Sequence, residues 1–178
     1  IIQTYIEKGD TLLTLDVSFD MPVIYTQIQG GEITKVPYKE KWKFPIDDFL
    51  NRINENTKMI MLTSPNSPTG DIIAEEHIEK ILQKAQNSAV VIDETYASYC
   101  GITHTHLSDK YENLIIIKSM SKDFAIAGLR LGYIISKAEN ISNIRKIVAP
   151  YSVNSIAATA GVISLQDKNH CQPFQAIV

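Results

Sequence analysis

The stretch "SMSKDFAIAGLRLGY", residues 119–133, gathers hydroxyl, amine and guanidinium groups into one short segment. Ser119 and Ser121 flank the approach to Lys122, and Arg130 follows a few residues later. A guanidinium fork matches the oxygens of a phosphate group, and a lysine amine can bond covalently to an aldehyde carbon. The segment therefore favours a site for a phosphorylated aldehyde.

Two other short segments carry polar groups that complement such a ligand. Asn66 lies in "TSPNSPTG", and Asp93 and Tyr96 lie in "VVIDETY", where each follows an apolar run. Pyridoxal phosphate is a phosphorylated aldehyde whose ring nitrogen needs an acidic partner. Asp93 is the candidate for that partner, and the three segments together predict a pyridoxal phosphate site.

Apolar runs and amphipathic stripes alternate along the chain and must position these groups. The pattern predicts strands at 11–16, 31–38, 58–64, 89–93, 114–118 and 131–136, and helices at 45–53, 74–86 and 139–149. In the last helix, Ile141, Ile144 and Val148 are expected to face inward, and Pro150 ends it. Runs such as "AVVID" and "LIIIK" suit strands buried on both faces. The order predicts an α/β fold, layered α/β/α around a mainly parallel sheet.

In such a sheet, ligands bind beyond the carboxyl ends of the strands. Asn66, Asp93 and Lys122 each come just after a predicted strand, so we expect them to meet at one edge. Strand alternation predicts that Glu94 faces away from Asp93.

Composition excludes several other classes of function. The net charge is −3 with no long basic run, and no apolar stretch approaches a membrane span, so neither nucleic acid nor membrane is an expected partner. Cys100 and Cys171 lie far apart, which predicts a reducing, cytoplasmic setting and no disulfide framework. We expect Cys100 to lie buried or near the pocket. His104 and His106 in "THTH" lack further ligands nearby, so a surface loop is favoured over a metal site.

The motifs "TSPNSPTG", "VVIDETY", "SMSK" and "AGLRLGY", in this order, resemble the class I/II aminotransferases of the aspartate aminotransferase superfamily. The resemblance is strongest to the branch of histidinol-phosphate aminotransferase and threonine-phosphate decarboxylase, which carries "PNNPTG", "DEAY" and "SK" before "AGLRLGY". The stretch "APYSVNSIAA", residues 149–158, resembles "PYNVN" of the same branch. The resemblance implies the large domain of a fold type I pyridoxal phosphate enzyme, a homodimer, and amino acid and 2-oxo acid substrates.

The resemblance also implies a role for each site residue. Lys122 would bind the cofactor covalently and move the proton at the substrate's α-carbon, and Asp93 would pair with the ring nitrogen. Tyr96 and Asn66 would hydrogen-bond the O3′ oxygen of the cofactor ring. Ser119, Ser121 and Arg130 would bind its phosphate group, and Phe19 would stack on the ring. Phe19 follows Val17 and Ser18 where the family has a "PT" pair, so its role is equally open to core packing.

Each of these residues also has a structural explanation. Asp93 could cap the following turn, Asn66 between two prolines could simply form one, and Tyr96 could be ordinary core. Ser119 and Ser121 could cap a helix beginning near Asp123. Their occurrence as an ordered set favours the catalytic interpretation.

Two expected parts of the family are missing from these 178 residues: an upstream glycine-rich phosphate turn and the arginine of a small C-terminal domain. We therefore expect residues 1–167 to be the central part of the large domain, 168–178 to be an irregular tail, and the small domain to be absent. Alternatives to a transaminase are a decarboxylase of a phosphorylated amino acid and a non-catalytic sensor domain.

Overall fold

Six strands form one sheet in the computed structural model, which describes residues 1–167 and residue 169. The strands are β1 (Thr11–Leu15), β2 (Glu32–Val36), β3 (Thr57–Thr63), β4 (Ala89–Asp93), β5 (Leu114–Ser119) and β6 (Gly132–Ser136). Their order in the sheet is β2-β1-β3-β4-β5-β6. All neighbours are parallel except β5 and β6, which are antiparallel. The predicted mainly parallel sheet is confirmed.

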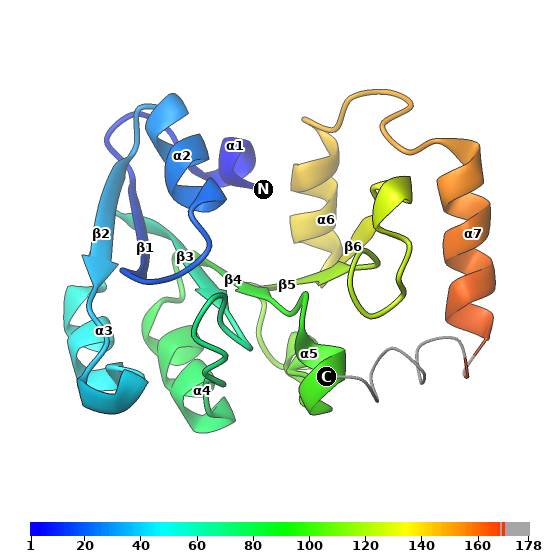
Figure 1. Cartoon of the computed structure of the whole chain (residues 1–178). Coiled ribbons are helices and arrows are strands. Elements are labelled where there is room, and N and C mark those ends of the chain that lie inside the picture. Colours follow the sequence, from blue (N-terminus) through cyan, green and yellow to red (C-terminus); the bar gives the residue numbers. More distant parts are fainter. Residues whose placement is uncertain (168, 170–178) are drawn as a thin grey trace.

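Helices cover both faces of the sheet (Figure 1). The helices are α1 (Ile2–Tyr5), α2 (Met21–Ile28), α3 (Ile46–Arg52), α4 (Glu75–Lys84), α5 (Ala97–Cys100), α6 (Ala138–Arg145) and α7 (Ser155–Gln166). The described residues also form short 3-10 turns in the connections between elements: η1 (Glu40–Trp42), η2 (Thr105–Asp109) and η3 (Ala127–Leu129). In Figure 1, α3, α4 and α5 lie on one side of the sheet, α1, α2 and α6 on the other, and α7 stands beyond β6. This is the predicted α/β/α layering.

Two apolar clusters, one on each face, hold the layers together. Successive residues of the central strands point to opposite faces: Ile60 packs into the cluster with α3 and α4, and Met61 packs into the cluster beside α1 and α6. The inward stripe predicted for 74–86 is confirmed, since Ile78, Ile81 and Leu82 are buried. The sheet is therefore fixed from both sides, and its strand ends form a rigid platform.

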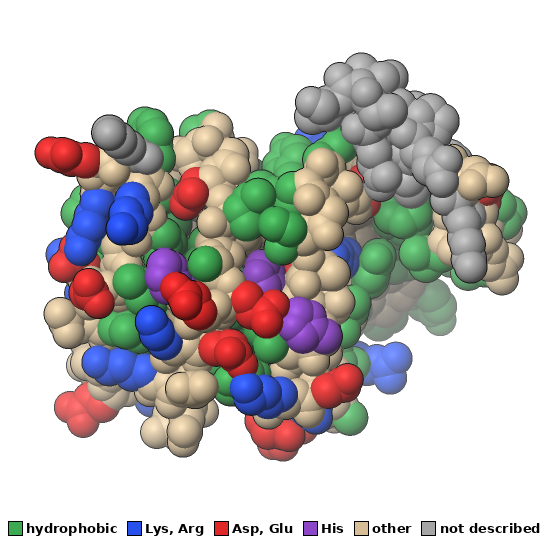
Figure 2. Space-filling view, turned by 90° about the horizontal axis from the view of Figure 1, so that it is seen from below, with side chains coloured by type: hydrophobic (Ala, Val, Ile, Leu, Met, Phe, Trp, Pro, Cys, Tyr) green, Lys and Arg blue, Asp and Glu red, His purple; other side chains and the backbone are tan. Residues whose placement is uncertain are grey.

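The outer surface of the helical layer formed by α3, α4 and α5 is polar. Figure 2 views the molecule from below and shows acidic, basic and histidine side chains mixed on that face. One ion pair there joins Lys110 Nζ to Glu79 Oε1 at 2.5 Å. Among the residues that the structure describes, no helix is long and apolar enough to cross a membrane.

The expectation for the last predicted helix was partly wrong. α6 ends at Arg145, and Ile144 is buried as predicted, but Val148 is 49% exposed. Beyond Arg145 the backbone bonds run from each N–H to the carbonyl three residues earlier, as from Val148 N to Arg145 O. This tighter winding rotates Val148 out of the buried stripe. The predicted tail, including Cys171, lies outside the described residues apart from Asn169.

Candidate functional site

The predicted site lies at the carboxyl ends of four neighbouring parallel strands. Thr63 of β3 is in register with Asp93 of β4, which in turn is in register with Ile117 of β5. The segments that follow these strands therefore leave the sheet at the same edge. They carry Asn66, Asp93 with Tyr96, and Lys122, so the sequence-based expectation that these residues meet is confirmed at the level of the strands.

Asp93 stands at the centre of this edge. Its Oδ1 accepts hydrogen bonds from Thr95 N at 2.9 Å and Thr95 Oγ1 at 2.6 Å, so it does cap the next turn. The same side chain lines a mostly apolar pocket of about 410 Å³. Because both bonds end on Oδ1, Oδ2 is the oxygen that can meet a ligand. The capping role and a ligand-binding role are compatible.

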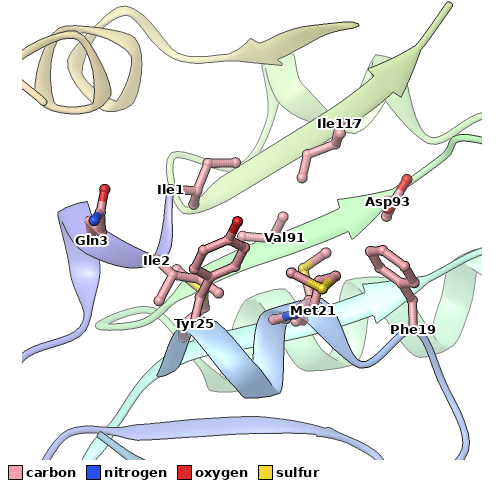
Figure 3. A pocket seen from close by; sticks show the side chains of 12 residues that line it. Ile1, Ile2, Gln3, Phe19, Met21, Tyr25, Val91, Asp93 and Ile117 are labelled. Atoms are coloured by element: carbon pink, nitrogen blue, oxygen red, sulfur yellow. The ribbon is translucent and has the colours of Figure 1, made fainter. Parts of the chain in front are cut away.

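Phe19 shares this pocket with Asp93. Figure 3 shows its ring at the same end of the pocket as the Asp93 carboxyl group, whereas Ile1, Ile2 and Gln3 lie at the other end. Phe19 is 52% exposed, so it is not a core residue. Of its two predicted roles, core packing is contradicted, and a ring exposed beside Asp93 is free to stack on a planar ligand.

Asn66 is buried and holds two strand ends together. Its Oδ1 accepts from Ser18 Oγ at 2.8 Å, and its Nδ2 donates to Val17 O at 2.9 Å and Thr69 Oγ1 at 2.8 Å. The turn-forming explanation of Asn66 is therefore correct. The bonds of Asn66 to Val17 and Ser18 also fix the segment that carries Phe19. Both amide hydrogens are engaged, so a hydrogen bond from Asn66 to a ligand would replace one of these bonds.

Tyr96 and Lys122 approach each other from adjacent strand ends. Lys122 Nζ lies 5.7 Å from the centroid of the Tyr96 ring, a cation–π distance. The Lys122 side chain is exposed at the strand edge, where a ligand can reach it. Tyr96 and Asn66 also line a second pocket of about 350 Å³ together with Cys100, which confirms the expected position of that cysteine near a pocket.

The remaining predicted ligands of a phosphate group lie at the end of β5, which is Ser119, and in the segment that follows it. Ser119 Oγ accepts a hydrogen bond from Ser121 N at 3.2 Å, so the two residues form a local turn. The alternative that they cap a helix near Asp123 is wrong, because the next helical turn begins only at Ala127. Arg130 follows that turn with a left-handed φ of 55°, and its Nη1 donates to Ala127 O at 2.9 Å. Its guanidinium group is exposed, with further donors available to an anion.

Glu94 faces away from Asp93, as predicted, and binds a residue whose burial was not predicted. His104 is only 1% exposed, so the surface-loop expectation is wrong for it, whereas His106 is exposed and pairs with Glu75. His104 N and Nδ1 lie 2.6 and 3.1 Å from Glu94 Oε1. The buried carboxylate needs donors, which draws His104 inward. Within the described part of the chain, no cluster of three or more candidate ligands could hold a metal ion.

Lys118 completes this buried cluster. Its Nζ lies 2.5 Å from Glu94 Oε2, and Thr103 Oγ1 donates to the same oxygen at 2.6 Å. Burial alone would raise the pKa of the Glu94 carboxyl, but the hydrogen bonds from His104, Lys118 and Thr103 outweigh burial and lower the pKa to about 2. Sequence reasoning missed Lys118 as a participant, although a charge ending the otherwise apolar run "LIIIK" was a usable signal.

Comparisons with known proteins show the family of this chain. The family model for aminotransferase class I and II matches residues 1–175. The histidinol-phosphate aminotransferase of Caldanaerobacter subterraneus subsp. tengcongensis is 36% identical over 158 residues, which cover 88% of this chain and 45% of that protein. The histidinol-phosphate aminotransferase of Clostridium novyi is 34% identical over 166 residues, which cover 93% of this chain and 46% of that protein.

Solved structures share the fold. A putative histidinol-phosphate aminotransferase from Erwinia carotovora atroseptica superposes with a TM-score of 0.90 at 25% identity, covering 98% of this chain and 53% of its own. The histidinol-phosphate aminotransferase from Sinorhizobium meliloti, solved in complex with pyridoxal-5'-phosphate, superposes with a TM-score of 0.89 at 20% identity. The superposition covers 98% of this chain and 49% of that chain, and at this identity it shows the fold alone. The chain spans about half the length of the relatives it matches. It belongs to the class I and II aminotransferases.

Proposed function

We propose that this chain is the cofactor-binding part of a pyridoxal phosphate-dependent aminotransferase of the histidinol-phosphate aminotransferase type. One observation carries the proposal: Asp93 and the exposed ring of Phe19 share a pocket at the strand edge where Lys122 follows the neighbouring strand. The similarity to histidinol-phosphate aminotransferases over most of the chain supports it. The reaction would transfer an amino group from an amino compound to a 2-oxo acid.

The residues present fit the chemical groups of pyridoxal phosphate. The cofactor has an aldehyde, a basic ring nitrogen, a phenolic oxygen and a phosphate group. The strand edge offers an amine, a carboxylate with its Oδ2 directed to no partner among the described residues, a phenol and an amide, an aromatic ring and a guanidinium group. Each group of the cofactor therefore has a complementary side chain at this edge.

Lys122 and Asp93 would carry the chemistry. When bound, the cofactor supplies an electron sink for the negative charge that develops at the substrate's α-carbon. The Lys122 amine would hold the cofactor covalently and then remove and return the proton at that carbon. The Asp93 carboxylate would hold a proton on the ring nitrogen, where its fixed negative charge stabilises the protonated form.

The other residues would bind and orient the cofactor. Phe19 would stack on the ring, and Tyr96 and Asn66 would hydrogen-bond its O3′ oxygen. Ser119, Ser121 and Arg130 would bind the phosphate through two hydroxyls and a guanidinium fork. Their common origin on strand ends and tight turns limits the movement that cofactor binding requires.

Covalent trapping tests the proposal. The full-length protein is loaded with pyridoxal phosphate, reduced with borohydride and digested, and the labelled peptide is identified by mass spectrometry. We expect the label on Lys122 and its loss in Lys122→Ala, whereas Lys110→Ala, which removes an exposed lysine elsewhere, should label normally. A label on a different lysine would overturn the assignment.

Product analysis separates the alternatives. With histidinol phosphate and a 2-oxo acid, a transaminase forms a new amino acid from the 2-oxo acid. Release of carbon dioxide from a phosphorylated amino acid would instead indicate a decarboxylase, and cofactor binding without turnover would indicate a sensor domain.

The proposal includes a homodimer in the cytoplasm, as expected from the family resemblance and from the two widely spaced cysteines.

A further inference from the structure

Two side-chain bridges join the segment after β4 to the end of β5 and to the segment that follows β5. The first is the ion pair between Glu94 Oε2 and Lys118 Nζ, at 2.5 Å. In the second, Ser98 Oγ donates a hydrogen bond to Asp123 Oδ2. Glu94 and Asp123 are 2% and 6% exposed, so both acceptors are shielded from water.

Along the sequence, the bridging residues flank two of the proposed site residues, Tyr96 and Lys122. Glu94 directly follows Asp93, and Lys118 is the fourth residue before Lys122. On the other side, Asp123 directly follows Lys122. One bridge therefore lies before the lysine and the other lies after it. The contact between Lys122 Nζ and the Tyr96 ring, at 5.7 Å, lies between them.

The first bridge is built for rigidity. The Glu94 side chain is completely buried and accepts from Lys118, from Thr103 Oγ1 and from His104 N. A buried carboxylate that accepts several hydrogen bonds cannot rotate without leaving a donor unpaired, which costs free energy. The backbone adds a further tie, since Glu94 N donates to Ile117 O at 2.9 Å. The end of β4 is therefore locked to the end of β5.

The second bridge restrains the other end of the lysine segment. Asp123 Oδ1 accepts from Phe124 N at 3.0 Å while its Oδ2 accepts from Ser98 of α5. Residues 120–126 have no helix or strand of their own. The bond from Ser98 ties this segment to α5, in addition to the backbone bond from Met120 N to Leu131 O at 3.0 Å.

We propose that Glu94 and Ser98, acting through Lys118 and Asp123, are positioning residues that set the Lys122 amine against Asp93 and Tyr96. This inference rests on the proposed cofactor site. Neither residue needs to touch the cofactor. The bridges fix the distance and direction between two strand ends, and so pre-organise the covalent attachment point relative to the ring-binding groups.

The test uses the full-length protein freed of cofactor and titrated with pyridoxal phosphate. Glu94→Gln keeps the size of the side chain but removes its charge, and Ser98→Ala removes one hydroxyl. Cofactor affinity is measured by quenching of protein fluorescence. The orientation of bound cofactor is measured by circular dichroism in its visible band, and folding by the thermal midpoint of the cofactor-free protein.

We expect at least tenfold weaker cofactor binding and an altered visible circular dichroism in Glu94→Gln, with a smaller change of the same kind in Ser98→Ala. Glu79→Gln is the matched control, because it also removes a glutamate that lies 2.5 Å from a lysine, but on the outer surface. It should leave affinity and circular dichroism unchanged.

A lower thermal midpoint with unchanged affinity and circular dichroism in the folded variants would overturn the inference, because the bridges would then serve stability alone. If Glu94→Gln does not fold, Ser98→Ala decides by the same readouts. The proposed function is tested separately: a wild-type protein whose cofactor absorption does not depend on Lys122 would contradict the site itself, whatever the bridge variants do.

Discussion

At the scale of single residues, Asp93 combines two tasks on its two oxygens. Oδ1 closes the turn with Thr95, and Oδ2 is left for a ligand in the pocket shared with Phe19. This division leaves a residue that caps a turn able to take the role that we propose for it beside the cofactor ring. Replacing Asp93 should therefore remove a preorganised charge without leaving a cavity in the apolar core.

We predict that Asp93→Ala lowers kcat of the full-length enzyme by about 10²-fold or more while the cofactor stays bound, because the negative charge beside the ring nitrogen is lost. Steady-state kinetics at saturating cofactor measure the effect. Thr95→Val is a useful comparison, since it removes a bond to Oδ1 but keeps the carboxylate. Near-normal turnover by Asp93→Ala would show that the ring proton is held elsewhere.

Glu94 leads to a prediction about pH. Its folded-state pKa of about 2 lies below the ordinary value of 4.5. A depressed carboxyl pKa contributes stability that is complete above the ordinary value and is lost as pH falls through the folded value. Glu94→Gln should therefore lower the free energy of unfolding by about 3 kcal/mol near neutral pH, and the difference from wild type should shrink between pH 4.5 and 2.

Urea unfolding of the full-length protein at several pH values measures this difference. Glu79→Gln again serves as the control, because its exposed pair contributes little. A difference between wild type and Glu94→Gln that stays constant down to pH 2 would contradict the assigned pKa.

At the scale of elements, the antiparallel pairing of β5 with β6 shapes the site. Gly132 lies opposite Ser119, and a Cβ at Gly132 would lie 2.8 Å from Lys118 O. Lys118 O is a backbone atom of β5, so it cannot move away by a side-chain rotation. The close approach of the two strands at this point therefore requires glycine.

We predict that Gly132→Ala destabilises the protein by about 1–3 kcal/mol through overpacking and weakens cofactor binding by displacing Ser119. Gly128→Ala is the matched control: a Cβ there meets nothing within 4 Å. Thermal unfolding and cofactor titration of both variants are the measurements. Equal behaviour of the two variants would show that β5 and β6 can separate without cost.

At the scale of the whole molecule, α7 leaves a large apolar surface. Ile156, Ile163 and Leu165 are 72%, 60% and 55% exposed, whereas Gly161 of the same helix lies against Leu131 and Met120. The helix thus packs on the body through a narrow side. Exposed apolar surface of this extent favours association.

We predict that residues 1–178 alone self-associate, bind pyridoxal phosphate weakly and do not turn over, since they span about half the length of their relatives. Ile156→Glu with Ile163→Glu should reduce the apparent mass in light scattering without lowering the thermal midpoint. A half-reaction with amino acids at a rate near that of the full-length protein would contradict the expected inactivity.

The sequence by itself determined the strands and the residues that follow them. Runs such as "AVVID" and "LIIIK" are apolar at nearly every position, and only a doubly covered strand accommodates that pattern. Once the strands are parallel, their carboxyl ends share an edge, so Asn66, Asp93 and Lys122 had to meet there. Local chemistry and periodicity were sufficient for this part.

The tertiary structure alone decided the rest. α7, "SIAATAGVISLQ", has small and apolar residues on all sides, so no amphipathic stripe predicts it or the side on which it packs. His104 reads locally as part of a polar loop, and only the distant carboxylate of Glu94 brings it inside. The pairing of Glu94 with Lys118 depends on two strands lying side by side. Contacts between segments far apart in sequence are set by the packed sheet, and a single sequence carries no periodic signal for them.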